Sequence, residues 1–138
     1  MKKLLRSKKA ESYIDTVVST MVIMMLLVLA LNIFSFLTMK QDMDYFAKEM
    51  LTVATQNGKT TGSEIDNRYL ELCSELGYTP EYSYVESNYY KSEYGYVQLG
   101  DTITITATYR TSLKGFGIFE MPITLTVTQS GLSQKYWK

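Results

Sequence analysis

A run of 24 residues from Thr16 to Met39 carries no charged side chain, and it limits what this chain can form more than any other feature. As a helix rising 1.5 Å per residue, the run would be about 36 Å long, enough to cross a hydrocarbon core of about 30 Å. Hydrocarbon offers no hydrogen-bond partner to backbone amides, so a segment that lies in lipid has to be helical. Glycine and proline are absent from the run. We therefore expect a transmembrane span over residues 16–39.

The main alternative to a permanent anchor is a secretory signal that is cleaved after export. Such signals have a shorter apolar region that ends in a small-x-small cleavage site. Here Met39, Lys40 and Gln41 follow the run without that pattern, so the sequence favours retention, whereas the alternative predicts a soluble product that begins near residue 40. Four polar side chains inside the run are either contacts between packed helices or simply tolerated in lipid; they are Ser19, Thr20, Asn32 and Ser35.

Positive charge gathers at the start of the chain, although the formal net charge of the whole chain is zero. Five of the first ten residues are basic: Lys2, Lys3, Arg6, Lys8 and Lys9. The segment after the apolar run, residues 40–49, mixes both signs. By the positive-inside rule, residues 1–10 are a cytoplasmic leader, and the C-terminal part lies outside the cell membrane. A basic segment can also bind nucleic acid, but the apolar run directly behind it favours a membrane flank, so we expect no nucleic-acid partner.

Apolar side chains recur at three- and four-residue steps beyond the membrane segment, from Met43 to Ala54. This spacing predicts that the helix continues with a single apolar stripe, and Asn57-Gly58 supplies its end. The expected organisation is a basic leader (1–10), a long helix (11–57) and an extracytoplasmic domain (58–138).

The stretch from Ser63 to Leu76 has the features of a second, shorter helix. Its apolar residues fall on one stripe, and acidic residues occupy its first turn, where the helix dipole favours them. We expect Ser63 to cap its N-terminus and Gly77 to close it. Cys73 lies on the apolar stripe, which favours a buried small hydrophobe over a reactive thiol.

After Pro80 the apolar period changes from 3.6 residues to 2. Residues 102–110 alternate strictly between apolar and mainly threonine side chains, and residues 121–129 repeat the alternation. They predict an antiparallel hairpin with one face on the helices and a threonine face toward solvent. Residues 81–87 and 94–99 are weaker strand candidates. The predicted fold is α+β: a long N-terminal transmembrane helix, a second short helix and a small antiparallel sheet of three to four strands.

The composition argues against catalysis and against a metal centre. The chain has no histidine, which is the commonest general base and zinc ligand, and its carboxylates are scattered among lysines. It contains no nucleotide-binding glycine loop, paired-carboxylate motif, Cys-x-x-Cys pair or Gly-x-Ser-x-Gly elbow. We expect no enzyme activity, no cofactor and no small-molecule substrate. An envelope enzyme would need a cluster of acids that the sequence does not contain.

Tyrosines concentrate between residues 82 and 96. Tyrosine combines a large contact area with a polar tip and is common at interfaces, but it also suits a pleated, half-buried strand. Strand packing and surface contact are therefore both open; the candidates for surface contact are Tyr82, Tyr84, Tyr89, Tyr90, Tyr94 and Tyr96.

Asp15 is an acid at the inner end of the apolar helix, where an ionisable group has to be paired or kept at the interface. It is the fifth residue after Ala10, which is a small residue directly behind Lys8 and Lys9. One interpretation is an interfacial acid favoured by the positive end of the helix. The other is that Ala10, Glu11 and Asp15 form a processing and assembly motif.

This layout resembles that of type IV prepilins, in which a short basic leader ends in a small residue and an acid stands at the fifth position after the cut. Within that group the whole chain is similar to the TadE-like pseudopilins of tight-adherence (Tad) systems and to their uncharacterised Gram-positive relatives. The resemblance implies cleavage after Ala10. It also implies that the Asp15 carboxylate neutralises the new α-amino group at Glu11 of a neighbouring subunit, since two buried opposite charges satisfy each other.

The resemblance implies a minor subunit of a Tad or type IV pilus or secretion apparatus, which acts by helix packing and surface contacts. The expected partners are membrane lipid and other pilin-like subunits or assembly-platform proteins. The chain departs from the family pattern at Ala10, Glu11, Asp15 and Thr16, where the family favours Gly, an apolar residue, Glu and an aromatic residue. The alternative is an unprocessed single-pass membrane protein whose outer domain binds a ligand or an envelope partner.

Overall fold

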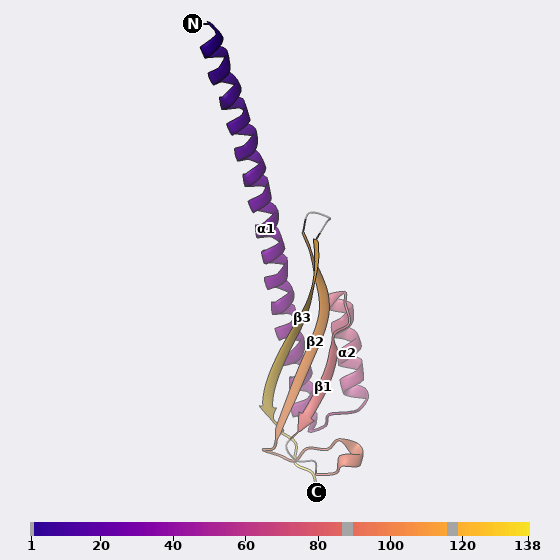
Figure 1. The fold of residues 1–138 in the computed structure, drawn as a ribbon. Helices are drawn as coiled ribbons and strands as arrows, with labels where there is room; N and C mark the ends of the chain where they lie inside the picture. Colours follow the sequence, from indigo (N-terminus) through magenta and orange to yellow (C-terminus); the bar gives the residue numbers. More distant parts are fainter. Residues whose placement is uncertain (1, 87–89, 116–118) are drawn as a thin grey trace. The chain divides into compact units, whose positions relative to one another are not determined.

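The computed structural model describes residues 2–86, 90–115 and 119–138 (Figure 1). The elements in chain order are α1 (Lys2–Asn57), α2 (Ser63–Leu76), β1 (Glu81–Glu86), the 3₁₀ helix η1 (Ser92–Tyr94), β2 (Thr102–Gly115) and β3 (Phe119–Leu132). They belong to two compact units: the first is Met1–Leu37 with Leu113–Met121, and the second is Thr38–Ser112 with Pro122–Lys138. The fold is α+β as predicted, with a long apolar helix, a short helix and a three-stranded antiparallel sheet.

The long helix α1 ends at Asn57, as predicted, but it begins at Lys2 rather than at residue 11. The leader extends the helix because lysine, arginine, leucine and alanine are good helix formers, and no glycine or proline precedes Gly58. Gly58 has a φ of +61°, a left-handed conformation that is typical of the residue after a helix end.

The second unit has a core built from the apolar stripe of α1, one face of α2 and one face of the sheet. Its fully buried apolar side chains include Met43, Phe46, Ala47, Met50, Ala54, Leu72, Val97, Ile103, Ile105 and Ala107. Ile65 on α2 and Leu125 and Val127 on β3 are also buried. The stripe that the sequence predicts beyond the membrane segment is therefore the part of α1 that belongs to the core of this unit.

The short helix α2 has the predicted bounds, but its N-terminal cap differs from the prediction. The cap residue is Gly62, and no side chain caps the helix; the Ser63 hydroxyl instead lies 3.4 Å from an Oε2 of Glu64. Gly62 adopts a φ of +138°, and its carbonyl accepts the amides of Ile65 and Asp66 at 3.1 Å each. At the other end Gly77 is left-handed, and its amide donates to the carbonyl of Cys73, as expected of a closing glycine.

The sheet has the order β1-β2-β3, and β1 pairs with β2 from Glu81↔Thr108 to Glu86↔Ile103. The weaker strand expected at residues 94–99 is wrong, because this segment holds the end of η1 followed by a loop. The reason is local: Gly95 has a φ of +63°, and the loop instead binds the α1–α2 connection, where the Val97 amide donates to the Gly58 carbonyl at 2.9 Å.

The outer face of the sheet is lined by hydroxyl groups, as predicted. Two pairs of them lie opposite each other on β2 and β3: Thr104 and Ser130 at 2.8 Å, and Thr106 and Thr128 at 3.3 Å. These side chains hydrogen-bond to one another across the strands, which stabilises the pairing of β2 with β3.

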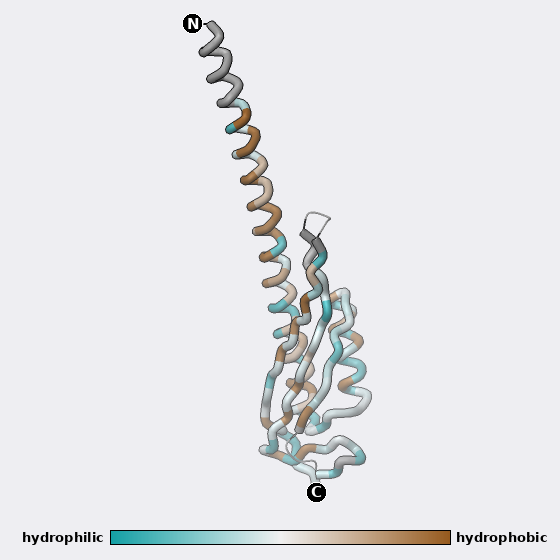
Figure 2. The backbone as a smooth tube through the Cα atoms, in the orientation of Figure 1, coloured by the Kyte–Doolittle hydropathy of each residue, from teal (hydrophilic) through white to brown (hydrophobic). Residues whose placement is uncertain are grey.

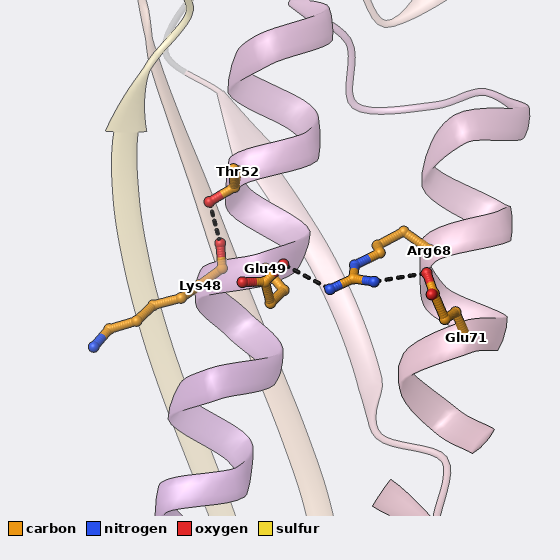
Figure 3. A network of polar contacts seen from close by, with 5 residues as sticks. All are labelled: Lys48, Glu49, Thr52, Arg68 and Glu71. Carbon is orange, nitrogen blue, oxygen red and sulfur yellow. Dashed lines mark hydrogen bonds and ion pairs between the residues drawn. The ribbon is translucent and has the colours of Figure 1, made fainter. Parts of the chain in front are cut away.

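A charged network joins α1 to α2 within the second unit (Figure 3). The guanidinium of Arg68 on α2 donates to Glu71 on the same helix at 2.6 Å and to Glu49 on α1 at 2.7 Å. These hydrogen bonds, to Glu71 first and then to Glu49, raise the pKa of Arg68 above its already high usual value. Arg68 is therefore the one side chain that bridges the two helices by ion pairs among the described residues.

Candidate functional site

The first unit exposes an apolar helix surface. From Tyr13 to Leu37, most large apolar side chains of α1 are exposed, and Figure 2 shows this stretch mainly in brown. Among the described residues α1 is the one helix that is long and apolar enough to cross a membrane, and its most apolar window has no buried residue. The core helix of a water-soluble protein would have such side chains buried. The helix is therefore compatible with a membrane anchor.

Two of the four polar side chains in the apolar run are satisfied inside the helix itself. The Thr20 hydroxyl donates to the Thr16 carbonyl at 2.8 Å, and the Asn32 amide donates to the Val28 carbonyl at 2.9 Å. Side chains that bond to the preceding turn carry a smaller penalty in lipid than unpaired ones. For Thr20 and Asn32, toleration within the helix is thus sufficient to explain the polar group.

The residues of the predicted processing motif lie within a continuous stretch of α1. Ala10, Glu11 and Asp15 all belong to the helix, and the Asp15 side chain is exposed. The side chains of Ala10 and Glu11 lie outside the described part of the structure. In the structure, Asp15 is therefore an exposed carboxylate within α1, five residues after Ala10.

The tyrosines of the rich stretch divide into two groups, and the first group faces the helices. On β1, Tyr82 lies 5.0 Å from Tyr69 and 6.4 Å from Phe46 between ring centroids, and Tyr84 lies 5.7 Å from Tyr82. The Tyr84 hydroxyl donates to the Met50 carbonyl at 2.9 Å. Burial raises the pKa of both Tyr82 and Tyr84, with a smaller contribution from Asp66 at Tyr82. These two rings pack the sheet against the helices.

The second group lies in the loop around η1 and contributes to a surface. Tyr90 and Tyr94 are exposed by 43% and 53%, and the half-buried Tyr96 lies beside Tyr94 with ring centroids 5.6 Å apart. Tyr89 lies outside the described residues. The sequence left strand packing and surface contact open for these tyrosines, and the structure shows packed positions on β1 and exposed positions around η1.

The surface also contains a residue that the sequence analysis missed, the single tryptophan Trp137. Its ring is stacked parallel on Tyr96 with centroids 4.1 Å apart. Hydrogen bonds hold it there: its indole Nε1 donates to the Gly58 carbonyl at 3.1 Å, and its backbone exchanges two bonds with the Gln98 side chain at 2.7 and 2.9 Å. The C-terminal segment is thus fastened both to the end of α1 and to the loop after η1.

Lysines surround these rings. The Lys59 ammonium lies 5.3 Å from the Tyr96 centroid and 5.6 Å from the Trp137 centroid. Lys135 lies 5.9 Å from Trp137, and Lys91 lies 5.8 Å from Tyr90. We call this group the aromatic–lysine patch; it consists of Lys59, Tyr90, Lys91, Tyr94, Tyr96, Lys135 and Trp137.

The rest of the described structure holds little that suggests chemistry. No group of three or more acidic or cysteine side chains that could hold a metal ion occurs among these residues. Cys73 is half-buried on α2, and its hydrogen bond with Tyr69 adds to burial in raising the pKa of that tyrosine. Tyr78 has its hydroxyl buried without a hydrogen-bond partner in the described parts of the chain, and burial raises its pKa to about 12.

Comparison with known families matches residues 20–138 to a family described as a domain of unknown function, DUF4320. No curated protein and no solved structure matches the chain. The match begins within the apolar stretch of α1 and continues through α2 and the whole sheet, so the family includes most of the exposed helix as well as the folded second unit. The chain therefore belongs to the DUF4320 family.

Proposed function

We propose that this chain is a pseudopilin-like minor subunit of a Tad or type IV pilus or secretion apparatus. It is anchored in the cell membrane by α1, with its leader in the cytoplasm and the second unit outside. It acts through helix packing and surface contacts rather than through catalysis. The observation that carries the proposal is the largely exposed apolar stretch of α1, which is continuous with helix turns that contribute to the core of a folded unit.

An apolar helix surface of this kind has two suitable environments, namely lipid and other apolar helices. A lipid-embedded pool supplies subunits, and a bundle of such helices forms the centre of an assembled filament. Moving from one to the other requires little change in the helix, because its apolar side chains suit both surroundings.

Asp15, the fifth residue after the proposed cut, sets how neighbouring subunits align along their helices in the assembly. An ionised carboxylate is unfavourable in the apolar part of a membrane, by about 2.5–3.5 kcal/mol at the helix centre and less toward its ends. Asp15 directly precedes the uncharged run, so its carboxylate stays at the membrane interface while the subunit is in the membrane. In an assembly the Asp15 carboxylate pairs with the α-amino group created at Glu11 of the neighbouring subunit. Each charge then compensates the other inside the apolar bundle.

Processing is tested by the mass of the protein extracted from the membranes of cells that produce it naturally. Loss of residues 1–10 is the expected result. An intact N-terminus in the membrane fraction would instead favour the alternative, an unprocessed anchor whose outer domain binds a partner. A soluble product that begins near residue 40 would contradict both.

The role of Asp15 is tested by Asp15→Ala, with Glu75→Ala on α2 as the control that removes an exposed acid elsewhere. Chemical crosslinking in whole cells should give a ladder of multimers for the parent chain and the control. The Asp15→Ala chain should stay in the membrane fraction, but its yield of crosslinked multimers should fall about tenfold or more. An unchanged ladder in Asp15→Ala would refute the assembly role of this residue.

A further inference from the structure

We propose that the aromatic–lysine patch binds an anionic polysaccharide, a polymer of sugars that carry carboxylate or phosphate groups at intervals. The inference depends on the geometry of the second unit alone. It goes beyond the pilus-type role, since that role requires only helix packing and subunit contacts.

The first support is the distribution of charge. Residues 38–112 and 122–138 carry eleven acidic and eight basic side chains, a net charge of −3. Within this acidic unit, Lys59 and Lys135 lie beside the Trp137 ring. Lys91 lies beside Tyr90, whose backbone amide donates to the Tyr96 carbonyl at 2.9 Å. Both ion pairs between described residues belong to Arg68, so none of these lysines forms a direct ion pair with a described carboxylate. A local excess of positive charge in an acidic unit is complementary to an anionic ligand.

The second support is the way the rings place the ammonium groups. Lys59 lies within 6 Å of both the Tyr96 and the Trp137 centroids, a distance at which a cation is attracted to the face of a ring. A carboxylate would neutralise the ammonium group. The rings attract it but leave its positive charge in place. Lys59 is half-buried, so its position is more restricted than that of an ordinary surface lysine.

The third support is the rigidity of the platform. Trp137 and Gln98 exchange two hydrogen bonds, and the indole is bonded to the Gly58 carbonyl. Ser133 is buried, and its hydroxyl donates to the Val97 carbonyl at 3.0 Å. A surface whose groups are already fixed loses little conformational entropy when a ligand binds.

The exposed rings favour a sugar polymer. Tyr94 and Tyr90 expose large amphipathic surfaces next to the lysines, and such rings can pack against the apolar C–H faces of sugars. A nucleic acid is a denser polyanion, and the net negative charge of the unit opposes it more strongly.

Binding is measured with the full-length chain in detergent micelles, by biolayer interferometry on immobilised polymers. The probe is polygalacturonate, and its matched control is fully methyl-esterified polygalacturonate, which has the same backbone without charge. We expect binding to the charged polymer that weakens in 500 mM salt, and binding to the neutral polymer at least about tenfold weaker.

The lysine variant is Lys91→Gln/Lys135→Gln, and its control is Lys40→Gln/Lys48→Gln, which removes the same charge from exposed positions on α1. Loss of two partly screened charge pairs should weaken binding about tenfold in the patch variant and about twofold or less in the control. Tyr94→Ala should also weaken it at least about threefold, whereas Tyr45→Ala, at an exposed tyrosine of α1, should not.

Several results would overturn the inference. They are equal binding of charged and neutral polymers, equal losses in the patch and control variants, and an oligo(dT) strand that binds more tightly than polygalacturonate. Absence of polygalacturonate binding at millimolar sugar would do the same. Since the assay needs neither cleavage nor assembly, its outcome is separable from that of the Asp15 experiment.

Discussion

Replacing Tyr78 with phenylalanine should stabilise the second unit, which is an unusual expectation for a change at a packed aromatic residue. The Tyr78 ring is packed against Tyr109, with centroids 4.3 Å apart and planes inclined by 34°. Its hydroxyl is buried and has no hydrogen-bond partner within residues 2–86, 90–115 and 119–138. Phenylalanine keeps the ring and the contact with Tyr109, and removes only the unsatisfied group.

The magnitude follows from the cost of an unmade hydrogen bond. A buried polar group without a partner costs about 1–3 kcal/mol. Losing the packing of one oxygen atom offsets part of that gain, so Tyr78→Phe should raise the free energy of unfolding by about 1 kcal/mol. The matched variant is Tyr84→Phe, which deletes a real hydrogen bond to the Met50 carbonyl. It should lower the free energy of unfolding by about 1 kcal/mol, so the two variants should differ by about 2 kcal/mol.

The chain itself provides the assay, because Trp137 is its one tryptophan and lies in the second unit. Urea unfolding of the full-length chain in detergent micelles, followed by tryptophan fluorescence, reports this unit without interference from the apolar helix. Neither substituted ring is among those in contact with Trp137. If Tyr78→Phe lowers stability as much as Tyr84→Phe does, the Tyr78 hydroxyl has a partner and the reasoning is wrong.

The same hydroxyl predicts a pH dependence. Burial raises the pKa of Tyr78 to about 12 from the ordinary value of 10.0, so the folded state holds this proton more tightly than the unfolded chain does. The stability that comes from this tighter proton binding is therefore fully present below pH 10. It is lost as the pH rises from 10 through 12, because the folded state resists ionisation of Tyr78. Tyr78→Phe should flatten the fall in stability over this range, though not abolish it, because the pKa values of Tyr82 and Tyr84 are also raised.

Two further predictions concern the connection after α1 and the bridge to α2. Gly58→Ala should destabilise the second unit by more than about 2 kcal/mol, because the left-handed conformation costs about 1 kcal/mol and the new Cβ would lie 2.5 Å from that of Lys135. Gly77 is also left-handed, but an added Cβ there would have no atom within 4 Å, so Gly77→Ala should cost only about 1 kcal/mol. Comparing the urea midpoints of the two variants checks this difference. Arg68→Gln should cost no more than about 1 kcal/mol, because its partners Glu49 and Glu71 are partly solvated, and this loss should shrink in high salt.

The elements with strong periodicity were predictable from the sequence. The end of α1, both ends of α2 and the first residues of β1 and β2 lie where the patterns place them, because each coincides with a glycine, a proline or a change of period. The start of α1 was not predictable in this way. A basic leader breaks the apolar pattern without breaking the helix, since lysine and arginine are good helix formers whether or not one face is apolar.

The loop after η1 shows where local patterns stop being informative. Residues 94–99 alternate well enough to suggest a strand, but their backbone hydrogen-bond partners include Gly58, Thr60, Tyr90 and Lys91 rather than a neighbouring strand. Glycine at position 95, with its positive φ, permits this path, and Thr60 and Thr61 lie so close to it that a Cβ would meet both hydroxyls at 2.8 Å. Such a contact joins positions 35 residues apart, and no short window contains it.

The division of the tyrosines follows from the same distinction between periodic and irregular backbone. Tyr82 and Tyr84 are two residues apart on a strand, so they must share a face, and the register of β1 against β2 makes that face the inner one. Beyond β1 the alternation of the strand is lost. Tyr96 contacts Lys59 and Trp137, and Tyr94 lies against Tyr96. A sequence can therefore identify tyrosines that pack in a regular strand, whereas a surface assembled from a loop, a helix end and a C-terminal segment becomes visible only when the fold brings these segments together.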